Sequence, residues 1–235
     1  MVRGYTARIR EYLCSKLEMR IIHKYHQFER PANNARAIVF SPHYDDETLG
    51  CGGTIIRMIK EGISVYLVFM TDGSTSHRHL MSAEELKRIR ASEGLSAAEC
   101  LGLRTDNVIH LRFPEGRLGV HASEAAAKIQ GMLNTLSPDA IFIPHAREPL
   151  LWSSDHRETH RIVVAALKKM TARSAVIWEY PIWYWYHWPW VGIDFRDRQQ
   201  AKIILKNTIL YRSGTRAWHD FNCSVAIKGE LDQKK

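Results

Sequence analysis

Residues 37–60 read AIVFSPHYDDETLGCGGTIIRMIK, and this stretch decides the fold. Residues 37–40 are apolar at every position, which is typical of a strand buried on both faces of a parallel sheet. Residues 48–60 have helical composition, and a polar loop joins the two segments. The stretch therefore predicts a strand, a loop and a helix in succession, the first unit of an alternating α/β fold.

The rest of the chain repeats this alternation. The expected strands are residues 37–40, 64–70, 108–111, 140–143 and 175–178, and the expected helices are residues 48–60, 83–101, 123–133 and 155–169. Strands that alternate with helices form a parallel sheet whose connections cover both faces. The sequence therefore predicts an α/β fold of the Rossmann-like kind, with a mostly parallel sheet and helices on both faces.

Three glycines, Gly50, Gly52 and Gly53, follow the first strand and invite comparison with a dinucleotide site. The full G-x-G-x-x-G spacing is missing, and acidic residues crowd the place where phosphates would lie. The sequence instead favours glycines that let the helix start close against the sheet.

The N-terminal segment has a pattern of its own. Residues 5–28 place apolar side chains three or four positions apart, with basic residues between them, which is a helical period. We expect residues 1–34 to form an N-terminal amphipathic helix and residues 35–235 to form a single α/β domain. The basic face of the helix is either a solvated outer face or a surface that lies on an anionic membrane.

Composition and charge exclude several classes of protein. Hydrophobic residues make up 45% of the chain and charged residues 25%, which argues against disorder and for a soluble globular domain. No apolar run approaches the ~20 residues that a membrane span requires, and no secretory signal is evident, so we expect a cytoplasmic location. The net charge of +8 is spread along the chain, and we expect no nucleic-acid partner.

The loop after the first strand carries the chemistry. An imidazole and three consecutive carboxylates lie within it, at His43 and at residues 45–47. Adjacent carboxylates repel one another unless a cation or strong hydrogen-bond donors hold them. His43 and Asp46 suit zinc, whose catalytic sites usually take three protein ligands and leave a position open for water. We expect a third ligand from the Asp155-His156 pair, which opens the helix after residues 140–143.

Asp45 lies beside these ligands and is the candidate general base, because a carboxylate near a metal-bound water can take its proton. A second interpretation of the same loop needs no metal. In that interpretation His43 is a surface residue, and Asp46 or Thr48 is the N-cap of the following helix.

The run His43-Tyr44-Asp45-Asp46-Glu47 resembles the His-Pro-Asp-Asp-Glu signature of the LmbE-like, PIG-L type N-acetylglucosaminyl deacetylases, with Tyr44 in place of the usual proline. Further segments resemble other motifs of that family, and they occur in the family's order. These segments are residues 71–77, 90–93, 113–116 and 155–160. The resemblance covers roughly residues 36–180.

The resemblance implies a Rossmann-like domain with one zinc ion held by His43, Asp46 and His156, and with Asp45 as the base. The function that it implies is removal of an N-acetyl group from an N-acetylated amino sugar or glycan precursor. Two alternatives stay open: a deacylase that acts on a longer N-acyl chain or a non-sugar amide, and a non-catalytic sugar-binding relative.

The same resemblance places Arg90 and Glu115 where family members have groups that contact substrate. Each residue also has a structural interpretation. Arg90 can form a salt bridge with Glu93 on one helix, and Glu115 can be an ordinary turn residue.

One motif departs from the family. Relatives carry His-Pro-Asp-His where this chain has Ser153-Ser154-Asp155-His156. A serine hydroxyl cannot supply a proton near neutral pH, so another group must protonate the departing amine. We expect either Asp45, once protonated, or His145, at the end of the preceding strand, to do so.

Residues 178–190 hold five of the seven tryptophans of the chain. So many aromatic side chains either pack, stack on a sugar, or contact a membrane interface. The partner that the resemblance implies is a small N-acetylated sugar, and residues 178–190 and the N-terminal helix are the candidate segments for peripheral membrane contact.

Overall fold

The computed structural model describes residues 12–13, 15–16, 26–27, 34–76, 79–148, 154–169, 175–184, 197–210, 212, 216, 220–227 and 229–230. These residues belong to two compact units. One unit consists of Met1–Glu29, Pro149–Leu151 and Trp183–Ala226, and the other consists of Arg30–Glu148, Trp152–Ile182 and Ile227–Lys235. The predicted boundary between residues 34 and 35 stays a prediction.

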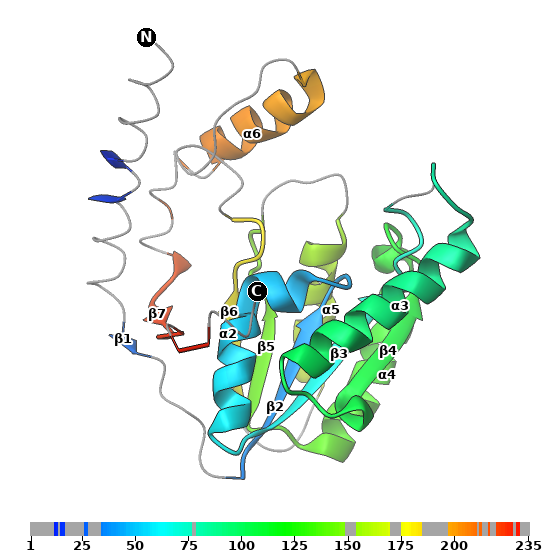
Figure 1. The fold of residues 1–235 in the computed structure, drawn as a ribbon, viewed down its shortest axis with the longest axis vertical. Helices are drawn as coiled ribbons and strands as arrows, with labels where there is room; N and C mark the ends of the chain where they lie inside the picture. Colours follow the sequence, from blue (N-terminus) through cyan, green and yellow to red (C-terminus); the bar gives the residue numbers. More distant parts are fainter. Residues whose placement is uncertain are drawn as a thin grey trace. The chain divides into compact units, whose positions relative to one another are not determined.

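The larger unit contains a five-stranded sheet in which every pair of neighbours is parallel (Figure 1). The strand order is β4-β3-β2-β5-β6. The bounds are Arg36–Ser41 for β2, Ser64–Thr71 for β3, Val108–Phe113 for β4, Ala140–Pro144 for β5 and Val176–Tyr180 for β6. The predicted α/β fold with a parallel sheet is confirmed.

Helices cover both faces of this sheet. Right-handed crossovers explain why, because the chain moves outward from β2 to β4 with its helices on one face, then returns to β5 and β6 with its helices on the other. The bounds are Asp46–Lys60 for α2, Ala83–Cys100 for α3, Ala122–Leu136 for α4 and Asp155–Leu167 for α5, and the short 3₁₀ turns are η1, Thr105–Asn107, and η2, Leu118–His121. In Figure 1, α2 and α3 lie in front of the sheet and α4 and α5 lie behind it.

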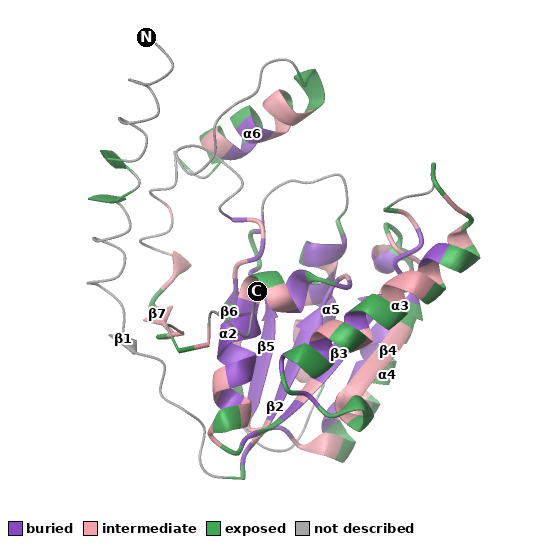
Figure 2. Ribbon diagram, in the orientation of Figure 1, coloured by how far each residue is buried: buried purple, intermediate pink, exposed green. Residues whose placement is uncertain are grey.

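The core lies between the sheet and these helices, and the central strands are buried along most of their length (Figure 2). On the face of α4 and α5, Ile38, Phe40 and Ile141 pack against Ile129 and Val163. Residues of β2 alternate between the two faces, and both faces are covered by helices, so β2 is apolar at successive positions.

The start of α2 differs from the expectation. The helix begins at Asp46 instead of residue 48, with Asp45 at the N-cap position but without a side-chain capping hydrogen bond. Asp46 and Glu47 lie in the first turn, where the helix dipole favours negative charge. Neither Asp46 nor Thr48 is therefore the N-cap that the metal-free interpretation required.

The smaller unit shows where local periodicity fails. His26–Gln27 forms β1, which pairs in parallel with β7, Cys223–Ser224. The expectation that the helix continues through residue 28 is therefore wrong at its end. The spacing of apolar residues along the chain does not indicate pairing with a distant strand. Residues 12–13 and 15–16 are helical, and the rest of the predicted N-terminal helix lies outside the described residues.

The smaller unit also contains α6, Arg198–Leu210. In the part of the chain that the structure describes, none of the helices combines the length and the apolar character that a membrane span needs. The cytoplasmic location and the membrane contact stay predictions.

Three of the aromatic residues that the structure describes in the segment 178–190 have identified contacts. Trp178 stacks on Phe142 at 6.5 Å between ring centroids, and the buried Tyr180 hydroxyl donates a hydrogen bond to the Phe40 carbonyl at 2.7 Å. Within the smaller unit, Tyr184 meets Phe221 edge to face at 4.8 Å. Residues 185–190 lie outside the described part of the chain.

The buried Gly94 of α3 offers a test of this packing. A Cβ added there would lie 2.5 Å from the Tyr44 ring and 3.2 Å from the Phe69 ring. Gly94→Ala is expected to lower the free energy of unfolding by about 1–3 kcal/mol, because the added methyl overpacks two rings. The measurement is the midpoint of urea-induced unfolding.

Gly131→Ala in α4 is the matched control, because Gly131 is exposed and a Cβ there meets nothing within 4 Å. It should raise the free energy of unfolding by roughly 0.5–1 kcal/mol through helix propensity. Equal free energies of unfolding of the two variants would mean that the Tyr44 and Phe69 rings can move to accommodate the methyl group without loss of stability.

Candidate metal centre

The strand order brings two distant loops together. β2 and β5 are neighbours, with Val39 opposite Phe142, although about a hundred residues separate them in the chain. The chain leaves β2 toward β3 on one side and reaches β5 on the other, so the sheet has its topological switch point between β2 and β5. In open α/β sheets ligands bind at the carboxyl ends of the strands flanking such a point.

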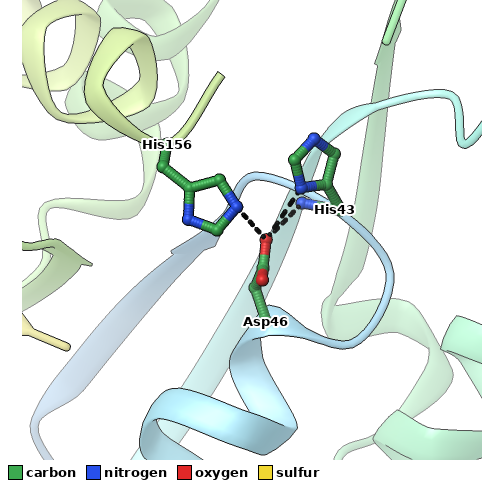
Figure 3. A group of neighbouring side chains, drawn as sticks. All are labelled: His43, Asp46 and His156. Atoms are coloured by element: carbon green, nitrogen blue, oxygen red, sulfur yellow. Dashed lines mark hydrogen bonds and ion pairs between the residues drawn. The ribbon is translucent and has the colours of Figure 1, made fainter. Parts of the chain in front are cut away.

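His43, Asp46 and His156 converge at this point (Figure 3). His43 follows β2, Asp46 begins α2, and His156 lies in the first turn of α5. One ligand atom from each lies within 4.8 Å of the others. Asp46 Oδ2 lies 3.1 Å from His43 Nδ1 and 3.4 Å from His156 Nε2, and it accepts a hydrogen bond from the His43 backbone N–H at 3.0 Å.

This group fits a divalent metal ion. Two imidazoles and one carboxylate are a common donor set for such ions, and three protein ligands leave a position open for water. Asp46 is 1% exposed, and its Oδ1 is buried without a hydrogen-bond partner among the described residues. A buried carboxylate oxygen left unpaired is costly unless a cation completes its environment. The metal-free interpretation of the loop leaves that atom unexplained.

Asp155 holds His43 from the far side of the ring. Its Oδ2 lies 3.2 Å from His43 Nε2 and accepts the Gly116 backbone N–H at 2.6 Å, while Oδ1 accepts the Leu118 N–H at 3.3 Å. Asp155 thus joins the loop after β4 to the ligand loop and orients the His43 ring with Nδ1 toward Asp46. From sequence, Asp155 was expected only as a member of the pair that supplies the third ligand, and its support of the His43 ring was not predicted.

The two imidazoles differ in charge. Burial would lower the pKa of His43, but hydrogen bonds to Asp155 and Asp46 outweigh it and raise the pKa to about 10. Burial lowers the pKa of His156, and neighbouring carboxylates only partly oppose this. Burial would raise the pKa of Asp46, yet the interactions with His156 and His43 hold it below its usual value. His43 is therefore protonated near neutral pH, His156 is neutral and Asp46 is ionised.

Asp45 lies next to this group with its side chain 50% exposed. Burial and the charge of Asp46 raise the pKa of Asp45 to about 6, and Arg90 partly offsets them. Arg90 donates to the Tyr44 carbonyl at 2.6 Å and to Asp45 Oδ2 at 3.3 Å. It also bonds Glu93 at 2.9 Å, so the helix salt bridge is present together with a contact to the candidate base.

Glu115 is brought to the edge of the metal group. Its Oε1 lies 3.9 Å from His43 Nε2, and its Oε2 accepts the Thr75 backbone N–H at 2.7 Å. Its own backbone N–H donates to Asp72 Oδ1 at 3.1 Å. These bonds tie the loop after β3 to the loop after β4, so Glu115 has a structural role in addition to any contact with substrate.

His145 follows β5 and is 4% exposed. Its Nδ1 accepts the Arg147 backbone N–H at 3.2 Å, and its Nε2 lies 3.5 Å from Glu179 Oε2.

His160 bonds the Pro144 carbonyl through Nδ1 at 3.1 Å, in keeping with a packing role. Ser153, where relatives carry a histidine, lies outside the described residues.

Metal binding should release about one proton per ion near pH 7.5. Ligation requires a neutral His43, which the metal-free protein holds protonated below a pKa of about 10, whereas His156 is already neutral. The metal dissociation constant should then fall about tenfold for each unit of pH rise from pH 6 to 8. Titration calorimetry in buffers of different ionisation enthalpy measures the released protons. Binding without proton release would contradict this account of His43.

Known proteins are similar to this chain in sequence and in fold. The sequence model of the family described as GlcNAc-PI de-N-acetylase, PIG-L, matches residues 38–167, more than half of the chain. The chain is 29% identical over 158 residues to a diacetylchitobiose deacetylase of Thermococcus kodakarensis, which covers 66% of this chain and 55% of that protein. The chain therefore spans about half the length of that relative.

Solved structures agree with the family match. An N,N'-diacetylchitobiose deacetylase from Pyrococcus horikoshii has a TM-score of 0.55 at 22% identity, over 85% of this chain and 75% of that chain, and so shares the fold. A conserved protein of Thermus thermophilus has a TM-score of 0.50 at 27% identity, over 76% and 79% of the two chains. The predicted resemblance is confirmed: the chain belongs to the GlcNAc-PI de-N-acetylase (PIG-L) family, and the candidate ligands His43, Asp46 and His156 lie inside the matched residues.

Proposed function

We propose that the chain is a zinc-dependent N-deacetylase that acts on an N-acetylated amino sugar or glycan precursor. The observation that carries the proposal is the buried His43–Asp46–His156 group at the switch point of the sheet, with the Asp45 carboxylate directly beside it. The relatives support the substrate class, because two of them are diacetylchitobiose deacetylases.

Zinc is the ion that this donor set suits best, with two imidazoles, one carboxylate and an open position. The chemistry that it supplies is polarisation of the acetamide carbonyl and a lowered pKa of the attacking water. Asp45 takes the proton of that water. With a pKa of about 6 it is ionised near neutral pH, yet basic enough to accept a proton.

Arg90 and Glu115 are the proposed substrate contacts. Arg90 holds Asp45 through one guanidinium nitrogen, and it presents a charged donor group beside the candidate base. Glu115 offers a carboxylate at the edge of the metal group that can accept hydrogen bonds from sugar hydroxyls. In this proposal Arg90 keeps its bonds to Glu93 and the Tyr44 carbonyl, and Glu115 keeps its bond from the Thr75 backbone N–H, when substrate binds.

The function is tested by metal analysis together with a free-amine assay on a panel of substrates. Zinc-loaded protein is expected to release amine and acetate in equal amounts from at least one N-acetylated amino sugar, to lose this activity with a chelator and to regain it with zinc. Amine release only from longer N-acyl chains or non-sugar amides would favour the first alternative. Sugar binding without amine release would favour a non-catalytic relative.

Asp45→Asn separates the base from the metal ligands. The variant is expected to retain zinc and to lose a factor of roughly 100 or more in turnover, the usual size of a general-base contribution. His156→Ala, in contrast, should lose tight zinc binding because it removes a ligand. Zinc content is measured by atomic emission and turnover by amine release. Normal turnover of Asp45→Asn would mean that another residue is the general base.

His145 is proposed as the proton donor to the departing amine, with Asp45 as the competing candidate. The proposal rests on the place of His145 directly after β5, at the end of the sheet where the metal group lies. His145→Ala should lose turnover at unchanged zinc content, and adding Ser153→His should restore part of it. An unaffected His145→Ala enzyme would leave Asp45 as the proton carrier.

A further inference from the structure

The ring of His156 has one nitrogen that the metal centre does not use. Nε2 faces Asp46 Oδ2, while Nδ1 is buried and has no hydrogen-bond partner among the described residues. A metal-ligating imidazole almost always donates its second N–H to a carboxylate, carbonyl or water, which fixes its tautomer and orientation. For His43 that role falls to Asp155.

Glu148 lies where the corresponding acceptor for His156 would be. Its side chain is fully buried, and its Oε2 lies 3.8 Å from His156 Nδ1. Its other oxygen, Oε1, accepts the Ile182 backbone N–H at 2.8 Å, and its own backbone N–H donates to the His145 carbonyl at 3.1 Å. The carboxylate is thus anchored at one oxygen and presents the other to the ring.

We propose that Glu148 is a positioning residue, whose Oε2 accepts the Nδ1–H of His156 and so holds Nε2 free to bind the metal. The inference rests on the metal centre of the proposed function. An approach of about 1 Å converts the present separation into a hydrogen bond of ordinary length. Each imidazole of the centre is then supported by its own carboxylate, His43 by Asp155 and His156 by Glu148.

Glu148→Gln tests this with almost no change in size. The amide has one oxygen, which can serve either the Ile182 N–H or the His156 Nδ1–H, while its nitrogen only donates. With the oxygen on Ile182, the amide N–H faces Nδ1 and favours the tautomer that carries its proton on Nε2. That tautomer cannot ligate a metal through the nitrogen that faces Asp46.

Glu158→Gln is the matched control. Glu158 lies on α5 two residues from His156 and bonds the exposed Arg161 at 2.9 Å, so the change removes an equal charge without facing the His156 ring. Competition with a chromophoric chelator should give a zinc dissociation constant that rises about 10–100-fold in Glu148→Gln. The constant should be unchanged in Glu158→Gln, and metal-free Glu148→Gln should melt at the wild-type temperature.

Each outcome separates the inference from the function on which it rests. A wild-type protein that binds no zinc overturns the metal centre and the inference together. Zinc bound equally by wild type and Glu148→Gln overturns the inference alone. Zinc affinity lowered equally in Glu148→Gln and Glu158→Gln also overturns it, because the loss would then come from the removed charge and not from the contact with His156.

A measurement on the wild type keeps the test open if Glu148→Gln fails to fold. In zinc-loaded protein, the ¹H–¹⁵N spectrum of the histidine rings should show a slowly exchanging proton on Nδ1 of His156. The same ring should show a metal-bound Nε2. A metal-bound Nδ1, or an Nδ1 proton that exchanges freely with water, would overturn the proposal.

Discussion

The carboxylate of Asp46 lies out of contact with water, and the arrangement of the whole site depends on how its charge is held. A buried carboxylate is costly unless donors and opposite charges surround it. Asp46 gains the backbone N–H and the protonated ring of His43 and the first turn of α2, where the helix dipole favours an anion, and it lies 3.4 Å from His156 Nε2. These contacts join the loop after β2 to the start of α5, so the charge that would favour a cation also brings the candidate ligands together.

Two adjacent carboxylates then acquire different properties. Asp46 is buried between the imidazoles and stays ionised, whereas Asp45 is half exposed and its pKa rises to about 6, in part because of the charge of Asp46. When their environments move the pKa values of two neighbouring groups apart, the two groups can take different chemical roles. One residue is suited to permanent ligation and the other to exchanging a proton near neutral pH. Arg90 partly offsets this rise in the pKa of Asp45.

The parts of this arrangement that could be predicted from sequence are those encoded locally. Runs such as residues 37–40 predicted buried parallel strands, and the polar loop after them predicted where the ligands would lie. Two kinds of feature could not be predicted in this way. The β1–β7 pairing depends on a segment nearly two hundred residues away, so periodicity extended a helix over His26–Gln27. The bond between Asp155 and His43, and the approach of Glu148 to within 3.8 Å of His156 Nδ1, depend on ring orientation, which residue spacing in the sequence does not indicate.

Tyr44 stands where the family signature has proline, in the loop after β2 that carries His43 and Asp46, and its side chain holds this loop in place. A proline would fix the backbone at that position by its ring. Tyr44 is instead held by its side chain, which packs 4.6 Å from Phe69 and bonds His110 through its hydroxyl at 3.1 Å. Its carbonyl still accepts the Arg90 guanidinium, and Gly94 leaves the space that the ring occupies. At this position packing against β3, β4 and α3 holds the chain, which links the geometry of the loop after β2 to the stability of the core.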